Sequence, residues 1–247
     1  TAVSGTDFTV LPYSWTGNTS QGWNTSNNWS PSGVPAPGAD IIIPGGLTNY
    51  PVLDQPRTYG NVSIASGGKM VLNGQTVTIQ GTISGNGVFT GGGNSSVVFT
   101  GSGDVGTLYM DQTTPGTTNT IKDLTINRSS NARMGLGNTL RVTGTVTPVA
   151  GTLETNGNLV LVSTSSGTAS IAASATCEYI IGTVTVQRYV GATRQWRMIG
   201  FPFTKETTVT AASMNLFYNS GAYAAYTYNE NADDGLYGNN NGMNAGW

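Results

Sequence analysis

Short apolar runs, interrupted every few residues by Gly, Asn or Ser, are the feature that most constrains how this chain folds. Residues 77–80, 97–100 and 184–187 alternate apolar and polar side chains at a period of two, which is typical of β-strands. Turn-forming residues follow such runs, as at residues 66–68 and 73–74. Amphipathic helical periodicity is weak throughout. We therefore expect an all-β fold of very short strands joined by tight turns.

The short runs also recur in a fixed order along the chain. Five of them reappear after 62, 63, 63, 64 and 62 residues, which pairs residues 62–64 with 124–126, 76–79 with 139–142, 81–83 with 144–146, 87–89 with 151–153 and 97–99 with 159–161. Repetition at a fixed spacing is typical of repeat architectures. The sequence therefore predicts two copies of a unit of about 62 residues within residues 59–182.

Within each copy, about three strands occupy some 20 residues, close to one coil of a β-solenoid. In that fold each coil stacks its strands in parallel on the preceding coil, buries the inward residues and exposes the polar ones in rows. Gly and Asn supply corners where a positive φ is often needed. We expect a right-handed parallel β-helix. The alternative is β-sandwich modules, because turn signals at such short intervals also fit hairpins.

The segments on either side of the repeat differ from it in composition. Residues 1–58 hold three tryptophans and many prolines, and we expect them to form a cap that protects the core and strand edges of the first coil. Residues 183–247 are rich in aromatic residues, Asn and Gly, and are expected to form a second cap or the start of a following domain.

The charge content of the chain is low and excludes several classes of partner. Only 9% of the 247 residues are charged and the net charge is -2, whereas about 25% is usual. Nucleic-acid binding needs clustered Lys and Arg, which are scattered here. No apolar run approaches the roughly 18 residues of a membrane-spanning helix. The single cysteine, Cys177, has no partner for an intrachain disulfide, so we expect it to be a buried apolar residue.

The residues available for catalysis are few. The chain has no histidine, which excludes Ser-His-Asp triads, Cys-His pairs and His-ligated zinc. Paired carboxylates of a polysaccharide-cleaving site remain conceivable, because stacked coils can align residues far apart in sequence. The acids and bases weighed for such a site are Asp104, Asp111, Asp123 and Glu154 with Lys122, Arg128, Arg133 and Arg141. They are too sparse for a convincing site, and we expect the chain not to be an enzyme.

One segment near the C-terminus is a candidate calcium loop. Asn229, Asn231, Asp233 and Asp234 place oxygen ligands at alternating positions before a glycine, as calcium loops do. The match is imperfect because one residue is inserted before the glycine and the twelfth position is not Glu. The alternative is a solvated Asn/Asp loop. Calcium is the one cofactor that we consider.

Three N-terminal tryptophans are candidates for ligand binding. Trp15, Trp23 and Trp29 could stack on sugar rings, since exposed aromatic side chains serve as recognition platforms. They could equally be buried anchors of a Pro-rich cap, where large rings stabilise loops. We favour the structural interpretation.

Two segments resemble a known group of proteins. The first comprises residues 15–18, 22–29, 34–35, 40–44 and 49–53, and the second comprises residues 186–190 and 194–202. Together they resemble the repeat modules of large Bacteroidota cell-surface proteins, including gliding-type adhesins exported by the type IX secretion system. The resemblance implies an exported surface protein with no catalytic residues to carry over. It also implies that the chain is part of a longer protein.

We therefore expect a non-catalytic, extracellular, structural or adhesive surface module of a larger secreted bacterial protein, located at the cell surface after export across the outer membrane. A surface polysaccharide or another cell-surface component is its expected partner. One alternative is a carbohydrate-binding module of a polysaccharide-degrading system. Another is the subunit of a self-assembling surface fibre that associates end to end, since solenoid ends and edge strands pair readily.

Overall fold

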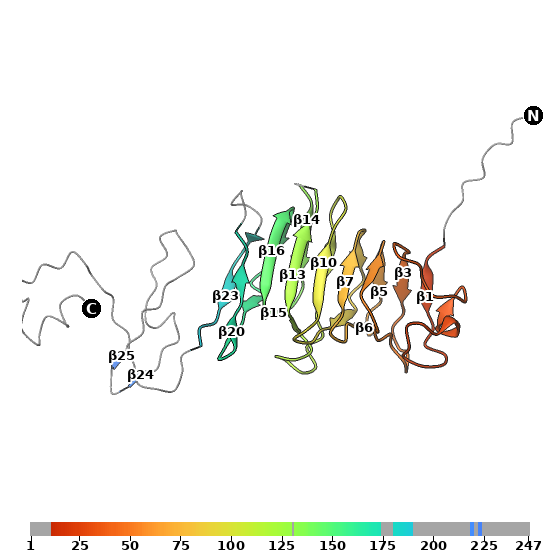
Figure 1. Ribbon diagram of the computed structural model, residues 1–247, viewed down its shortest axis with the longest axis horizontal. Coiled ribbons are helices and arrows are strands. Elements are labelled where there is room, and N and C mark those ends of the chain that lie inside the picture. Colours follow the sequence, from red (N-terminus) through yellow and green to blue (C-terminus); the bar gives the residue numbers. More distant parts are fainter. Residues whose placement is uncertain (1–10, 130, 174–179, 190–217, 220–221, 224–247) are drawn as a thin grey trace, which may run out of the picture. The chain divides into compact units, whose positions relative to one another are not determined.

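The computed structural model describes residues 11–129, 131–173 and 180–189, and the backbone of two further strands. The chain divides into two units, Thr1–Ala192 and Thr193–Trp247. In the second unit, β24 (Tyr218–Asn219) and β25 (Ala222–Tyr223) form an antiparallel pair. The first unit is a stack of coils, and a complete coil contributes one short strand to each of three faces (Figure 1).

Parallel strands build all three faces. The first face consists of β1 (Tyr13–Trp15), β3 (Ile41–Ile43), β5 (Val62–Ile64), β8 (Ile83–Ser84), β11 (Gly106–Leu108), β14 (Arg133–Leu136), β17 (Thr152–Glu154) and β22 (Ile180–Ile181). The second face consists of β4 (Arg57–Tyr59), β7 (Thr76–Ile79), β10 (Ser96–Phe99), β13 (Asp123–Asn127), β16 (Thr145–Ala150) and β21 (Ser170–Ile171). The third face consists of β6 (Lys69–Val71), β9 (Val88–Thr90), β12 (Thr120–Ile121), β15 (Leu140–Val142), β18 (Leu159–Leu161) and β23 (Val184–Val186).

Few elements lie outside these faces. A single turn of 3-10 helix, η1 (Ser26–Asn28), leads into β2 (Trp29–Ser30), which pairs with β1 in antiparallel fashion. A small hairpin joins β19 (Ser163–Thr164) to β20 (Gly167–Thr168). Among the described residues, no helix is both long and apolar enough to cross a membrane.

The coil length is close to the sequence prediction. Ile41 pairs with Val62 and Val62 pairs with Ile83, so residues 41–61 make one coil and residues 62–82 make the next. The predicted all-β class and the β-solenoid are therefore confirmed, with about seven turns, and the β-sandwich alternative is not the observed fold. The coil that runs from Val97 to its partner Leu124 is longer, because it carries a loop at residues 111–119.

That loop changes the meaning of the predicted repeat. Val62 lies in β5 on the first face, whereas Leu124, its predicted equivalent in the second copy, lies in β13 on the second face. Three coils without an insertion would bring the chain back to the first face at about residue 124. Because the loop adds residues, the chain at Leu124 has reached only the second face, and the first face follows at β14. The similarity between the two segments reflects their common strand-and-turn pattern, and equivalent positions repeat at the coil spacing instead.

The coil stack is also longer than residues 59–182. β1 already pairs in parallel with β3, and β3 with β5, so stacking begins within the segment predicted as an N-terminal cap. At the other end, β23 still stacks on β18 beyond residue 183. Most of the Trp and Pro residues of this segment lie in the long loops between the first strands. The sequence therefore predicted a cap and not the strands β1 and β3.

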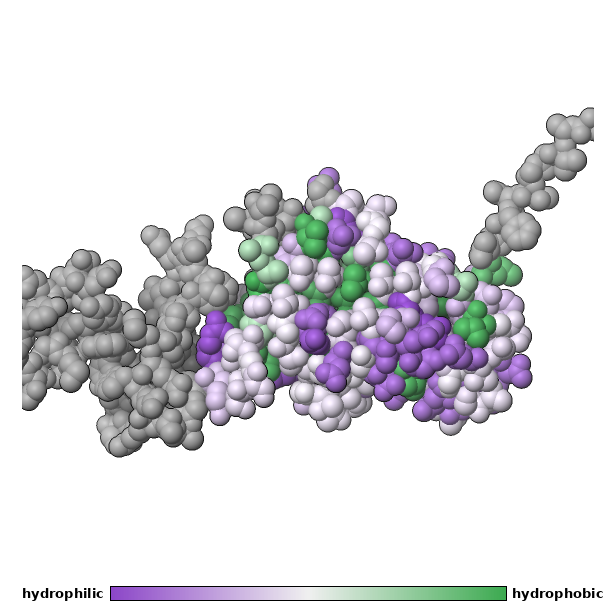
Figure 2. Space-filling model, in the orientation of Figure 1, coloured by the Kyte–Doolittle hydropathy of each residue, from purple (hydrophilic) through white to green (hydrophobic). Residues whose placement is uncertain are grey.

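Outward positions of the stack are polar but carry little charge. Figure 2 shows large areas of intermediate hydropathy, with strongly hydrophilic residues gathered in patches. Ser, Thr and Asn supply most of the polarity, in keeping with a chain of which only 9% is charged. Such a surface stays hydrated through neutral hydrogen-bonding groups.

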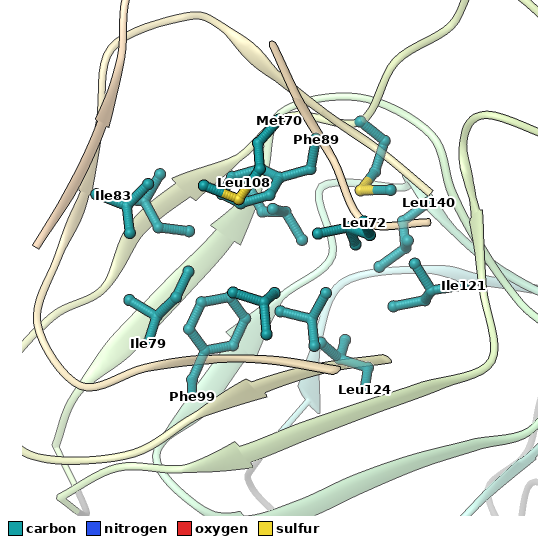
Figure 3. Close-up of a cluster of buried hydrophobic side chains, with 14 of the residues drawn as sticks. Met70, Leu72, Ile79, Ile83, Phe89, Phe99, Leu108, Ile121, Leu124 and Leu140 are labelled. Carbon is teal, nitrogen blue, oxygen red and sulfur yellow. The ribbon is translucent and has the colours of Figure 1, made fainter. Parts of the chain in front are cut away.

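Inward positions form continuous apolar rows along the stack. On the second face, Val77 pairs with Val97, Val97 with Leu124, and Leu124 with Val146, and all four are fully buried. Figure 3 shows side chains of the three faces, among them Phe99, Met70 and Leu108, converging on one core. Burial of each such side chain contributes about 1.5–3 kcal/mol, so every coil adds its own share of stability.

Candidate functional site

The three tryptophans pack against one another at the N-terminal end of the core. Trp15 and Trp23 have no exposed surface, and Trp29 retains 3%. The ring centroids of Trp23 and Trp29 lie 4.7 Å apart, and those of Trp15 and Trp29 lie 4.9 Å apart, both in edge-to-face geometry. Aromatic pairs favour such arrangements. The antiparallel pairing of β1 with β2 sets Trp15 directly opposite Trp29.

The indole N–H groups of the cluster mostly bond to backbone. Trp15 Nε1 donates to the carbonyl oxygen of Asn49 at 2.8 Å, and Trp29 Nε1 donates to that of Trp23 at 3.0 Å. Trp23 Nε1 is buried and finds no partner among the described residues. Because none of the rings offers a face to solvent, the cluster is core and not a platform for sugars. The burial of these three residues therefore favours the structural interpretation over the ligand role.

An arginine continues the core at this end. Arg57 pairs with Val77, so it occupies the N-terminal position of the apolar row on the second face. Its guanidinium carbon lies 5.4 Å from the centre of the Trp23 ring, a cation–π arrangement. Its Nη2 donates to Asn24 Oδ1 at 2.8 Å and to Asp54 Oδ1 at 2.6 Å. Arg57 thus covers one side of the tryptophan cluster, and Asn24 and Asp54 hold its guanidinium in place.

The titratable groups next to Arg57 respond to it and to burial. Burial tends to raise the pKa of the Asp54 carboxyl, but the hydrogen bond and charge of Arg57 outweigh this, and the pKa falls below its ordinary value. Burial raises the pKa of Tyr59, whose ring lies 5.2 Å from that of Trp23. A solvent-open depression of about 330 Å³ adjoins the cluster, next to Asn24, Asp54 and Asn73. Its one carboxylate is already paired with Arg57.

The acids considered for a catalytic site are already engaged in contacts within the fold, and Asp104 and Glu154 both contact Arg133. Asp104 Oδ1 accepts from Arg133 N at 2.8 Å, and Asp123 Oδ1 accepts from Thr145 N at 2.9 Å. Glu154 forms an ion pair with the Arg133 side chain. Among the described residues, no three or more His, Cys, Asp or Glu side chains are grouped as metal ligands would be.

Asp111 is the most enclosed of these acids and supports the loop at residues 111–119. It accepts hydrogen bonds from Thr90 Oγ1 and from Thr113 N, both at 2.9 Å. Burial tends to raise the pKa of its carboxyl, but the hydrogen bonds from Thr113 and Thr90, together with the charge of Lys69, lower it overall. The charged form of Asp111 therefore stabilises the turn that follows β11.

Polar side chains stack from coil to coil at the corner between the second and first faces. Asn61 N donates to Asp40 Oδ1 at 2.6 Å, and one coil later Thr82 N donates to Asn61 Oδ1 at 2.9 Å. A Cβ on Gly60 or Gly81 would lie only 2.3–2.4 Å from these acceptor oxygens. The sequence signal is a glycine before the polar residue that precedes a strand, and it was not recognised as a ladder.

The same corner contains a buried arginine. Arg128 is 3% exposed, and its guanidinium donates to several carbonyl oxygens: those of Gln80 at 2.6 Å, Ser102 at 2.6 Å and Gly103 at 2.7 and 3.0 Å, and that of Thr100. Burial lowers the pKa of Arg128, and the nearby charge of Asp104 opposes this effect. Arg128 is one of the basic residues considered for a catalytic groove. In the structure it is a donor that satisfies carbonyl groups of the two preceding coils.

The predicted calcium ligands Asn229, Asn231, Asp233 and Asp234 lie outside the described residues, so calcium binding remains a prediction. The same applies to the burial predicted for Cys177.

Comparison with known proteins gives one match. Residues 14–118 match a family described as a domain of unknown function (DUF8693). The matched stretch contains the tryptophan cluster and the first coils, and the coil stack continues beyond it to β23. No curated protein and no solved structure matches the chain.

Proposed function

We propose that this chain is a non-catalytic structural and adhesive module of an exported bacterial surface protein, with the stacked coils acting as a spacer that presents a polar surface. The observation that carries the proposal is the stacking of parallel strands over about seven coils, which on the second face is one continuous sheet from β4 to β21. Each coil repeats the same core and corner contacts, so length can be added without a new fold.

The chemistry of the described residues supports a structural role. Three charged side chains that are largely enclosed, Arg57, Arg128 and Asp111, hold turns and the end of the core together. The chain has no histidine, and the carboxylates weighed for catalysis are engaged in separate hydrogen bonds. The low charge favours contact with other neutral surfaces over contact with polyelectrolytes.

Export to the cell surface is part of the proposal and rests on the sequence. The supporting features are the resemblance of residues 15–53 and 186–202 to Bacteroidota surface repeats, and a composition rich in Gly, Asn, Ser and Thr. Immunolabelling of intact cells of the source organism tests it. Labelling only after the cells are opened would contradict surface exposure.

Deletion of one coil tests the spacer. Removal of residues 62–82 takes out β5, β6 and β7 and brings β8 to the register of β5, because Val62 and Ile83 occupy equivalent positions. We expect a folded chain shortened by about 4.8 Å, the spacing between neighbouring strands, in small-angle scattering. The matched control removes residues 62–71, half a coil, and should not fold because it brings strands to the wrong faces. Equal behaviour of the two deletions would contradict the spacer.

Adhesion is tested separately with beads that carry the full chain and beads that carry an unrelated protein of similar charge. We expect the former to be retained on bacterial cells and on their isolated surface polysaccharides. Equal retention of both kinds of bead would contradict the adhesive part of the proposal.

End-to-end self-association is the second candidate function. Among the described residues, β21, β22 and β23 are each the last strand of their sheet, so each has an edge without a described partner. Such edges favour pairing with another chain. Sedimentation over a wide range of concentration tests this candidate, and a monomer at the highest concentration would contradict it.

A further inference from the structure

The outer surface of the second face carries a regular row of β-branched residues. The strands β4, β7, β10, β13 and β16 pair in register, and β7, β10, β13 and β16 lie side by side in Figure 1. Their central outward residues are Thr58, Thr78, Val98, Thr125 and Thr147, all half-buried. We call these five residues the threonine row. Neighbouring members lie about 4.8 Å apart, which is the strand spacing of a sheet.

Parallel rows of neutral polar groups flank the threonine row. Two residues earlier stand Thr76, Ser96, Asp123 and Thr145, on β7, β10, β13 and β16, and two residues later on the first three of these four strands stand Gln80, Thr100 and Asn127. On β16 the register shifts at this point, and the exposed Val149 takes the place of a polar residue. The surface is thus mainly a grid of hydroxyl and amide groups, with Asp123 as its one charged member and Val98 and Val149 as its apolar members.

The hydroxyl groups of this grid are available for a ligand. Among the described residues, the hydroxyls of Thr78, Thr125 and Thr147 form no hydrogen bond, unlike the hydroxyl of Thr90, which donates to Asp111 Oδ2 at 2.9 Å. Threonines at the corners differ: the hydroxyl of Thr82 donates to Asn61 Oδ1, and that of Thr155 donates to the carbonyl oxygen of Thr183 at 2.8 Å. The fold therefore uses its corner hydroxyls internally and leaves those of the threonine row free.

The dimensions of the grid argue against a second copy of the chain as its occupant. Five strands at a spacing of about 4.8 Å, with up to three outward positions each, cover on the order of 300–400 Å². A stable protein interface buries roughly 800 Å² on each partner. A thin polymer that runs across the strands needs only a narrow strip and meets the same groups at every coil.

We propose that the threonine row binds an extended, uncharged polysaccharide that lies along the stack axis and crosses the strands. Hydroxyl and amide side chains recognise sugar hydroxyls, and the nearly neutral surface complements a neutral polymer. The proposal deepens the adhesive part of the proposed function and rests on it. Each hydroxyl contributes little because it exchanges a bond with water for a bond with sugar, so affinity comes from repeated contacts along successive coils.

The test uses native gels of the full chain, cast with β-glucan, xylan or mannan as neutral probes and with alginate as the acidic control. We expect at least one neutral polysaccharide to retard the wild-type chain more than alginate does, and short oligosaccharides of the same sugar to compete weakly. Lack of retardation by every neutral probe, or stronger retardation by alginate, would overturn the proposal.

Matched variants localise the binding. The triple variant Thr78→Val, Thr125→Val, Thr147→Val removes three hydroxyls but keeps the β-branched shape that suits a strand. We expect it to lower affinity at least about tenfold, which corresponds to a few lost hydrogen bonds. The control variant Ser63→Ala, Ser84→Ala, Thr107→Val likewise removes three hydroxyls, on the first face, and should retain wild-type affinity.

The outcomes separate this proposal from the proposed function. Equal affinity of the triple variant and the wild type, with bead adhesion intact, would overturn the threonine row as the site and leave the adhesive module standing. If the triple variant loses bead adhesion and the first-face control variant keeps it, the result supports both the threonine row as the site and the adhesive function. Thermal melting of both variants establishes that each is folded.

Discussion

Arg128 Nη1 donates a hydrogen bond to the carbonyl oxygen of Gln80, 48 residues earlier, at 2.6 Å. Gln80 follows β7, and Arg128 follows β13, so the bond spans the coil of β10 that lies between them. The same guanidinium also donates to the carbonyl oxygen of Gly103 in that middle coil. One side chain therefore satisfies the turn carbonyls of successive coils where no regular strand pairing can.

Replacement of Arg128 should destabilise the stack strongly. Arg128→Met leaves several enclosed carbonyl groups without a donor, and we expect the free energy of unfolding to fall by about 2–4 kcal/mol. Arg133→Met is the matched control, because the Arg133 side chain is 59% exposed and pairs with Glu154 at the surface. Its cost should stay below about 1 kcal/mol. Urea unfolding measures both, and equal losses would contradict a special role for Arg128.

The two glycines of the turn at residues 101–103 allow the cost of a steric collision to be separated from the cost of backbone strain. Gly101 has a φ of 89°, and a Cβ there would lie 2.4 Å from the carbonyl oxygen of Gln80. Gly103 has a φ of 73°, but a Cβ there would meet nothing within 4 Å. Gly103→Ala should therefore cost only the backbone strain of about 1–2 kcal/mol.

Gly101→Ala should cost clearly more than Gly103→Ala, because it adds the collision with the Gln80 carbonyl to a similar strain. Gly93→Ala is the control without either penalty, since Gly93 has open space around it and no positive φ. Thermal melting of the three variants gives the order of stability. A Gly101→Ala variant as stable as Gly103→Ala would show that the turn relaxes.

The strands and the coil length were predictable from the sequence because they depend on local patterns. The alternation at residues 77–80 and 97–100 fixes which side chains face inward, and the structure buries Val77 and Val97 accordingly. The spacing between turns predicted a coil close in length to the observed one, which carries the chain from Val62 to its partner Ile83. Both signals depend on residues close together in sequence.

The corner contacts were not predictable because they depend on the register between coils. Nothing in the sequence near Arg128 indicates that its partner is the carbonyl group of Gln80, and the loop at residues 111–119 shifts the register that the predicted repeat assumes. The tryptophan cluster was ambiguous for a related reason. Tryptophans occur both in sugar-binding surfaces and in buried cores, so the sequence alone does not assign Trp15, Trp23 and Trp29 to either. Their burial in the structure places them in the core.

Acid should weaken the loop that Asp111 supports. The pKa of Asp111 is lower in the folded chain than its ordinary value of 3.8, so its charged form stabilises the fold above that value. This contribution is lost as the pH falls from about 4 through the lower folded pKa. Asp111→Asn should therefore reduce stability at neutral pH and should lose less stability on acidification than the wild type.

Urea unfolding of the wild type and Asp111→Asn at neutral pH and at about pH 2 measures the difference. Thr90→Val is a second variant that removes one donor to the carboxylate and keeps the charge. It should show a smaller change in acid sensitivity, because Thr113 N still donates to Asp111. An unchanged pH dependence in Asp111→Asn would mean that other carboxylates, such as Asp54, account for acid sensitivity.

The indole groups of the tryptophan cluster provide a matched pair of substitutions. Trp15 and Trp23 are both fully buried, but only Trp15 Nε1 has a partner, the carbonyl oxygen of Asn49 at 2.8 Å. Trp15→Phe removes the donor and leaves that carbonyl unsatisfied, whereas Trp23→Phe removes a buried N–H that has no described partner. We therefore expect Trp15→Phe to be the more destabilising of the two by about 1 kcal/mol or more in urea unfolding. A larger loss for Trp23→Phe would mean that its cation–π contact with Arg57, or a water bound to its N–H, contributes more than the Asn49 hydrogen bond.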